Sequence, residues 1–197
     1  MKPVERTELM DLKAYEAARN DFRAKVMAHK DKRRVYVGDV MNFLFETNLT
    51  MHYQVQEMMR AEQITAEAAI QHELDTYNEL VPPDGELAAS LLIEYEEPAV
   101  RDVQLKKLMG LHEHVFFQIG EMRCKAEFDQ RQMGEDRLSS VQYVRFPLSQ
   151  AQREAWLSEA SRGKVALVID HPEFEATAIL SPVTAAVLAQ DFTSGLN

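Results

Sequence analysis

Histidine, glutamate, aspartate and arginine are densest in one stretch of this chain, between Asn48 and Gly85. Imidazole and carboxylate groups serve as metal ligands and as acid–base catalysts, so these residue types indicate those two kinds of chemistry. The candidate site residues of the stretch are His52, Gln56, Glu57, Arg60, His72 and Asp75. The sequence predicts a polar site here if the local structure brings these side chains together.

Spacing decides which of these residues could act on one ligand. His72 and Asp75 are three positions apart, so both could reach one metal ion from a helix. Neither a Glu-x-x-His nor a His-Glu-x-x-His motif occurs in the chain. Two readings therefore stay open. In the first, the polar residues are metal ligands or acid–base groups around one pocket. In the second, they form the solvent-exposed faces of two amphipathic helices.

A second pair of histidines, His112 and His114, gives another metal prediction. The segment 112–119 has the pattern of a strand, on which residues two apart point to the same face. Such a pair could supply two ligands to a divalent or transition metal, with a carboxylate from elsewhere completing the site. The alternative is a pair of exposed histidines at a strand end.

Two successive helices are expected to position the first site. Asn48 is the expected N-cap of the first helix and Thr65 that of the second, because their side chains can accept a backbone hydrogen bond. The second helix should end before Pro82 and Pro83, which cannot continue it. The predicted apolar stripes are Met51, Val55 and Met58 in the first helix, and Ile70, Leu74, Tyr77 and Val81 in the second.

The other segments alternate between expected helices and strands. Helices are predicted at 7–33, 98–109 and 150–162 and from Ser181-Pro182 onward, and strands at 35–37, 40–45, 87–95, 112–119, 122–129, 141–146, 165–169 and 174–180. The polar segment 130–137 is predicted to be a loop. We therefore expect a single α+β domain over residues 1–197, with a mainly antiparallel sheet, helices packed on it and an N-terminal helical region.

Composition limits the partners and the location of the protein. The net charge of −10 opposes general binding to nucleic-acid phosphates, which requires clustered cations. No apolar run approaches the roughly 20 residues of a membrane span, and the first eight residues lack the apolar core of a secretory signal. Cys124 is the single cysteine and lies on the apolar face of its predicted strand. We expect a cytoplasmic protein with a buried thiol and no contact with nucleic acid or membrane.

Several segments carry a resemblance to a known family. They are residues 1–9 (MKPVERTEL), 53–58 (YQVQEM), 71–78 (QHELDTYN), 90–94 (SLLIE) and 170–172 (DHP). Through them the chain resembles a bacterial family catalogued as a domain of unknown function (DUF3501). The resemblance implies a bacterial cytosolic protein of one domain, with no established activity or catalytic residues. It also implies a redox or stress-response setting, because proteins of this family are often encoded near rubrerythrin-like and iron–sulfur redox proteins.

These observations leave two hypotheses of different classes. The first is a non-enzymatic binding or accessory module, because no complete catalytic constellation is recognisable. Its polar surface over residues 52–79 would face a protein partner or a second copy in a homodimer. The second is a metal-dependent enzyme, with redox chemistry as one option. Its candidate ligands are His52, Glu57, His72 and Asp75, or His112 with His114.

Overall fold

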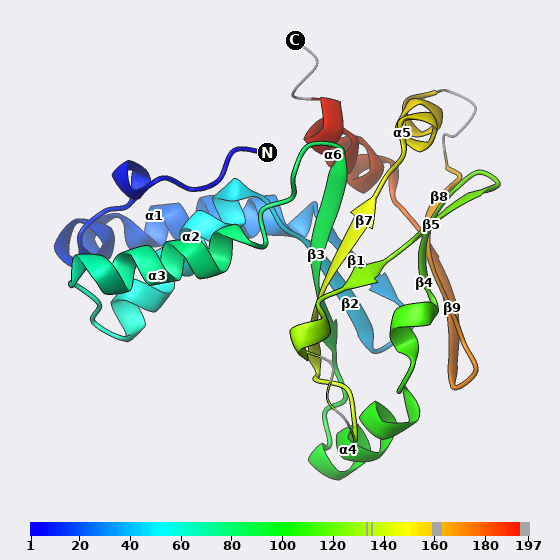
Figure 1. The fold of residues 1–197 in the computed structure, drawn as a ribbon. Coiled ribbons are helices and arrows are strands. Elements are labelled where there is room, and N and C mark those ends of the chain that lie inside the picture. Colours follow the sequence, from blue (N-terminus) through cyan, green and yellow to red (C-terminus); the bar gives the residue numbers. More distant parts are fainter. Residues whose placement is uncertain (133, 135, 159–162, 194–197) are drawn as a thin grey trace.

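A helical arm lies beside a body built from two β-sheets in the computed structural model of the chain (Figure 1). The structure describes residues 1–132, 134, 136–158 and 163–193. The arm consists of the turn η1 (Arg6–Glu8) and the helices α1 (Leu12–Asp31), α2 (Asn48–Ala61) and α3 (Glu67–Asn78). The end of the predicted helix at 159–162, with residues 133 and 135 of the predicted loop, lies outside the described residues.

The body alternates strands and short helices. Its strands are β1 (Arg34–Val37), β2 (Met41–Phe45), β3 (Glu86–Ile93), β4 (Val115–Ile119), β5 (Met122–Lys125), β6 (Glu127–Phe128), β7 (Val141–Pro147), β8 (Val165–His171) and β9 (Phe174–Ile179). Its helices are α4 (Pro98–Lys107), α5 (Gln150–Leu157) and α6 (Pro182–Thr193), and its 3-10 turns are η2 (Leu111–Glu113) and η3 (Gln130–Gln132). One sheet has the order β1-β2-β3-β7-β6 and the other β5-β4-β8-β9, and the strand pairs in both are antiparallel. The predicted α+β class is confirmed.

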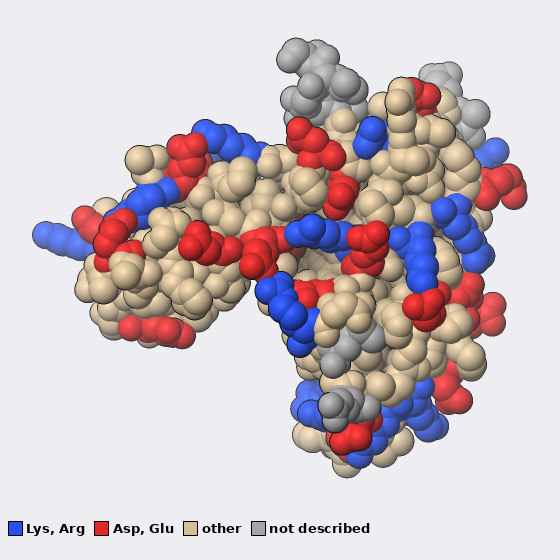
Figure 2. Space-filling view, viewed as in Figure 1, with Lys and Arg blue, Asp and Glu red and all other residues tan. Residues whose placement is uncertain are grey.

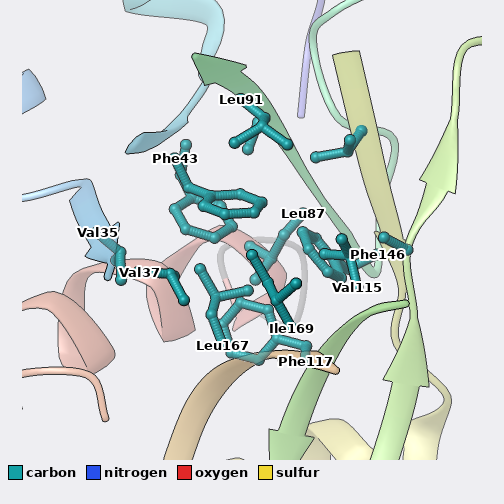
Figure 3. Packing of buried hydrophobic residues seen from close by; sticks show 14 of the residues in the cluster. Val35, Val37, Phe43, Leu87, Leu91, Val115, Phe117, Phe146, Leu167 and Ile169 are labelled. Atoms are coloured by element: carbon teal, nitrogen blue, oxygen red, sulfur yellow. The ribbon is translucent and has the colours of Figure 1, made fainter. Parts of the chain in front are cut away.

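The two sheets wrap around one apolar core. The predicted strand 122–129 is divided into β5 and β6, because the chain changes sheets at Ala126, whose N–H donates to the carbonyl of Val115. On the opposite side, β1 contacts β8 and β9. Figure 3 shows rings and aliphatic side chains from both sheets meeting in this core, including Phe43, Phe117 and Phe146. Burial of this apolar surface is the main driving force for folding of the body.

The arm has a second, separate apolar cluster. Met51, Val55, Ile70 and Leu74 of the predicted stripes are buried in it. Met59 is buried there, whereas the predicted Met58 is only partly buried, because α1 packs on a second face of α2. The arm and the body therefore bury separate apolar clusters. The expectation of a single domain over residues 1–197 stays a prediction.

Each of the two predicted N-caps is shifted by one residue. Thr47, not Asn48, is the N-cap of α2, and its hydroxyl accepts from the N–H of Thr50 while the Thr50 hydroxyl accepts from Thr47. Asn48 donates instead to the carbonyl of Lys2. The N-cap of α3 is Ala66, which supplies no side-chain bond, so Thr65 does not cap it. The second helix is consequently held by packing rather than by its cap.

A buried ion pair fixes α6 to the junction of α1, β1 and β2. Arg33 is 1% exposed, and its guanidinium donates to the Phe45 carbonyl at 3.0 Å and to Asp191 Oδ1 at 3.1 Å. Burial raises the pKa of Asp191, and the neighbouring Arg33 lowers it in part. Because a charge in an apolar environment needs a partner, each member of this pair depends on the other.

Asp191→Ala should lower the free energy of unfolding by about 3–5 kcal/mol, because it leaves Arg33 buried without its counter-ion. Urea denaturation measures the change. The matched control is Asp102→Ala, whose partners Lys106 and Arg137 lie on the surface, and it should cost less than about 1 kcal/mol. Equal losses in the two variants would contradict this role of the buried pair.

Candidate functional site

A cavity of about 450 Å³ lies where the arm meets the outer face of the five-stranded sheet. Its lining residues are Glu46, Glu79, Leu80, Ala88, Ala89, Ser90, Glu127, Phe128, Asp129, Gln130, Arg131, Tyr143, Val144 and Arg145. Figure 2 shows this part of the surface as a hollow with cationic and anionic side chains around it. A cavity of this volume is within the range that holds small molecules.

Strand alternation builds the floor of the cavity. Leu87 and Leu91 of β3 point into the body core, so Ala88 and Ser90 between them point outward, toward the arm. Ala88 and Ser90 are small side chains, and their partners across the β3–β7 ladder are the larger Arg145 and Tyr143. The small residues leave space over β3, and the larger residues on β7 form a side of that space.

Glu46 supplies the least satisfied polar group of the cavity. It follows β2 directly and is 4% exposed, with its N–H bonded to the carbonyl of Ala88. The Ser90 hydroxyl donates to its Oε1 at 2.6 Å. Its Oε2 is buried and has no hydrogen-bond partner among the described residues. An unpaired buried carboxylate oxygen is costly, so a donor delivered by a ligand would stabilise this site.

Ion pairs form the rim of the cavity. The guanidinium of Arg131 bonds to Asp129 Oδ2 at 2.7 Å and to Glu79 Oε2 at 2.6 Å, and it lowers the pKa of Asp129. Arg145 donates to the backbone carbonyl of Glu79 at 2.6 Å. These contacts join the end of α3 to β7 and η3. Both contacts thus hold Glu79, at the end of the arm, against the body at the rim of the cavity.

Aromatic and aliphatic side chains complete the walls. Phe128 and Tyr143 line the cavity, and burial raises the pKa of the Tyr143 hydroxyl. Leu80 from the arm and Val144 from the sheet add apolar surface. Ser90 shares its hydroxyl hydrogen with Glu46, so it positions the carboxylate. The arrangement can hold a molecule that has both a hydrogen-bond donor and an apolar part.

The residues predicted on α2 mostly join that helix to α1. Glu57 accepts from Tyr15 Oη at 2.6 Å and from Arg19 Nε at 2.7 Å, and these partners are on α1. Arg60 donates to Glu16 Oε2 at 2.7 Å. The Gln56 side chain is buried and bonds to the backbone N–H and carbonyl of Met10. These three polar groups therefore act within the arm.

The histidines of the arm lie in different environments. The His52 ring packs beside Phe22 with centroids 5.0 Å apart, and burial lowers its pKa. His72 and Asp75 of α3 are exposed, and Asp75 accepts from Gln71. Within the described part of the chain, His, Cys, Asp and Glu residues nowhere gather in a group of three or more that could hold a metal ion. The role predicted for these residues stays a prediction.

The strand predicted for His112 and His114 starts later than expected. Gly110 has a φ of 90°, and η2 follows it, so His112 lies in a 3-10 turn and β4 begins at Val115. The two rings make different close contacts. His112 packs near Phe128 and bonds to Glu113, whereas His114 bonds to Asp170 at 3.1 Å. The prediction that one strand face presents both rings is wrong.

Sequence reasoning missed the cavity residues Glu46, Ser90, Tyr143 and Arg145. They come from three separate segments, and no spacing rule connects them. One local signal existed, since the predicted alternation of β3 already placed Ser90 on the face opposite to Leu91. A second local signal was Glu46 itself, because it is a charged residue between a predicted apolar strand and a predicted helix.

The comparisons with known proteins identify the family. The model of the family described as Protein of unknown function (DUF3501) matches residues 3–192. The chain belongs to this DUF3501 family. No curated protein matches the chain. The family membership confirms the resemblance and assigns no activity.

A crystal structure described as a novel protein of unknown function from Burkholderia pseudomallei K96243 is similar to this DUF3501 chain. It shares 34% sequence identity, with a TM-score of 0.87. The match covers 96% of this chain and 99% of that one. The similarity therefore includes both the arm and the body. Within the described residues, none of the helices is long and apolar enough to cross a membrane.

Glu57→Gln should lower the free energy of unfolding by about 2 kcal/mol, because hydrogen bonds to a charged group contribute on that order. Arg19 lowers the pKa of Glu57, so this stabilisation is complete above the ordinary pKa of 4.5 and is lost as pH falls below it. Denaturation curves from pH 7 down to pH 3 measure the loss. The wild type should lose stability over this range more steeply than the variant, and parallel profiles would contradict the assignment.

The Cys124 thiol should react slowly with iodoacetamide in the folded protein. It is 5% exposed, and burial raises its pKa to about 11, so little thiolate forms near neutral pH. Mass spectrometry of the native and urea-unfolded protein measures the two rates. The native rate should be lower and should rise up to about pH 11. Equal rates in both states would show that the thiol is accessible.

Proposed function

We propose that the chain is a non-enzymatic binding module that holds a small molecule in the cavity between the arm and the sheet. One observation carries the proposal. Glu46 is a buried carboxylate that lines the cavity, and only one of its two oxygens has a partner in the described residues. Buried polar groups in folded proteins are nearly always paired, so the free oxygen favours a ligand that completes the pairing.

Binding is a better fit than catalysis for the groups around the cavity. A nucleophile needs an adjacent base that can take its proton, and the base is usually oriented by a third group. Ser90 donates to Glu46, but the free oxygen of that carboxylate has no described group to orient it. Arg131 is tied to two carboxylates of the rim. These contacts hold side chains of the rim in place around the cavity.

The position of the cavity supports an accessory role. Leu80 and Glu79 come from the arm, and Ser90 and Tyr143 come from the sheet, so a bound molecule would touch both parts. A ligand that contacts two parts favours the arrangement in which both contacts form. Occupation of the cavity could in this way be signalled to a protein partner or to a second copy through the arm.

Other parts of the proposal rest on the family resemblance alone. They are the bacterial source and the redox or stress-response setting. The predicted partner surface over residues 52–79 is reduced, because Gln56 bonds to Met10 and Glu57 bonds to Arg19 of α1. His72 and Asp75 remain exposed and would form the contact area of such a surface.

Ala88→Leu should abolish binding of small molecules, because the added carbons would occupy the space above β3. The measurement is a thermal-shift screen of a small-molecule library, followed by native mass spectrometry of the hits. Ala99→Leu is the matched control, since it adds the same atoms on the exposed surface of α4. A hit that stabilises the wild type and Ala99→Leu, but not Ala88→Leu, is the expected result.

Two outcomes would contradict the proposed function. The first is a screen in which no compound stabilises the wild type. The second is a set of hits that stabilise the wild type and Ala88→Leu equally, because such compounds would bind outside the cavity. Urea denaturation of each variant establishes that the folded state is compared in every case.

A further inference from the structure

We infer that the cavity takes a small organic cation, namely an ammonium or guanidinium group on a short apolar stem. This inference rests on the proposed function and names the class of its ligand. Its starting point is Glu46, which lines the cavity and whose buried Oε2 has no hydrogen-bond partner among the described residues. A carboxylate accepts hydrogen bonds and donates none, so the missing partner must be a donor.

A charged donor is the best partner for this oxygen. An ammonium or guanidinium both donates a hydrogen bond to a carboxylate and carries the opposite charge, and a neutral donor supplies the hydrogen bond alone. Ser90 already supplies a neutral donor to Oε1. A second neutral donor would leave a negative charge buried in the protein, whereas a cation would neutralise it. The chemistry of Glu46 therefore favours a cation over a neutral alcohol or amide.

The charges around the cavity favour the same sign. Four carboxylates and two guanidiniums line it, which gives a net charge of −2 when all are ionised. The carboxylates are Glu46, Glu79, Glu127 and Asp129, and the guanidiniums are Arg131 and Arg145. Arg131 is paired with two of these carboxylates. An anion would meet an excess of negative charge, and a cation would be attracted to the opening.

Lys30 is a cation close enough to interact electrostatically with Glu46, but its ammonium is directed elsewhere. Its ammonium lies over the Tyr53 ring, 5.4 Å from the centroid. Burial lowers the pKa of Lys30, and Glu46 raises it by a smaller amount. Within the described residues, Lys30 and Glu46 form no ion pair. The charge of Glu46 is therefore available to a ligand.

The walls suit the stem of such a ligand. Phe128 and Tyr143 can contact a cation with their ring faces, and Leu80 and Val144 can contact methylene groups. The volume of about 450 Å³ has room for an alkyl amine, a diamine or an alkyl guanidine. The charge of the lining, rather than its size, is therefore what favours a cation.

Isothermal titration calorimetry with matched probes tests the inference. Putrescine and agmatine are the cations, butanediol is the neutral analogue of putrescine, and succinate is the dianion of the same chain length. We expect heat of binding with the cations and none with butanediol or succinate. Added salt should weaken the binding, because part of the attraction is electrostatic.

Glu46→Gln should weaken binding of putrescine about tenfold or more, because it removes the charge that accepts the ammonium. Glu175→Gln is the matched control. It makes the same change in net charge at an exposed position of β9, and it should leave the affinity unchanged. Equal affinity of the wild type and Glu46→Gln would overturn the inference, as would equal losses in both variants.

The outcomes separate this inference from the proposed function. One outcome is that succinate or butanediol binds, that neither cation binds and that Ala88→Leu removes the binding. In that case the cavity is a binding site, but the assignment of a cation as its ligand is wrong. If neither cation binds and the library yields no cavity ligand, both fail. If a cation binds to the wild type and to Ala88→Leu equally, it binds elsewhere, and the inference fails.

Discussion

A buried carboxylate requires partners for both of its oxygens, and the part of the structure around Glu46 depends on this constraint. The residue lies between the last position of β2 and the N-cap of α2, so it cannot leave the joint without disturbing both elements. Ser90, on the neighbouring strand, satisfies one oxygen. The other oxygen has no partner among the described residues and belongs to a residue that lines the cavity, and this is the basis on which we propose a binding site at the joint.

The rest of the structure keeps this joint open. Arm and body bury separate apolar clusters, so neither needs to fill the space between them. The arm is stiffened by the bonds of Glu57 to Tyr15 and Arg19, and its end is held to the sheet by Arg131 and Arg145. A cavity whose walls are held by such bonds needs less ordering when a ligand binds, which lowers the cost of binding.

The sequence predicted the fold better than the site, for a physical reason. Period-2 alternation in 87–95 and apolar stripes on the two arm helices report local burial, and they led to the α+β class and antiparallel pairing. The cavity depends on tertiary contacts that no local pattern encodes, such as the bond between Glu46 and Ser90, which are 44 positions apart. His112 and His114 were predicted as metal ligands on one face of a strand. They lie in and directly after a 3-10 turn instead, because the strand begins later, after the turn that follows Gly110.

A crystal structure of the protein grown with putrescine tests the central claim most directly. The account predicts electron density in the cavity, with a ligand nitrogen about 3 Å from Glu46 Oε2 and the stem against Phe128 and Tyr143. Absence of ligand from the cavity at saturating putrescine, with Glu46 Oε2 bonded instead to another side chain of the protein, would contradict it.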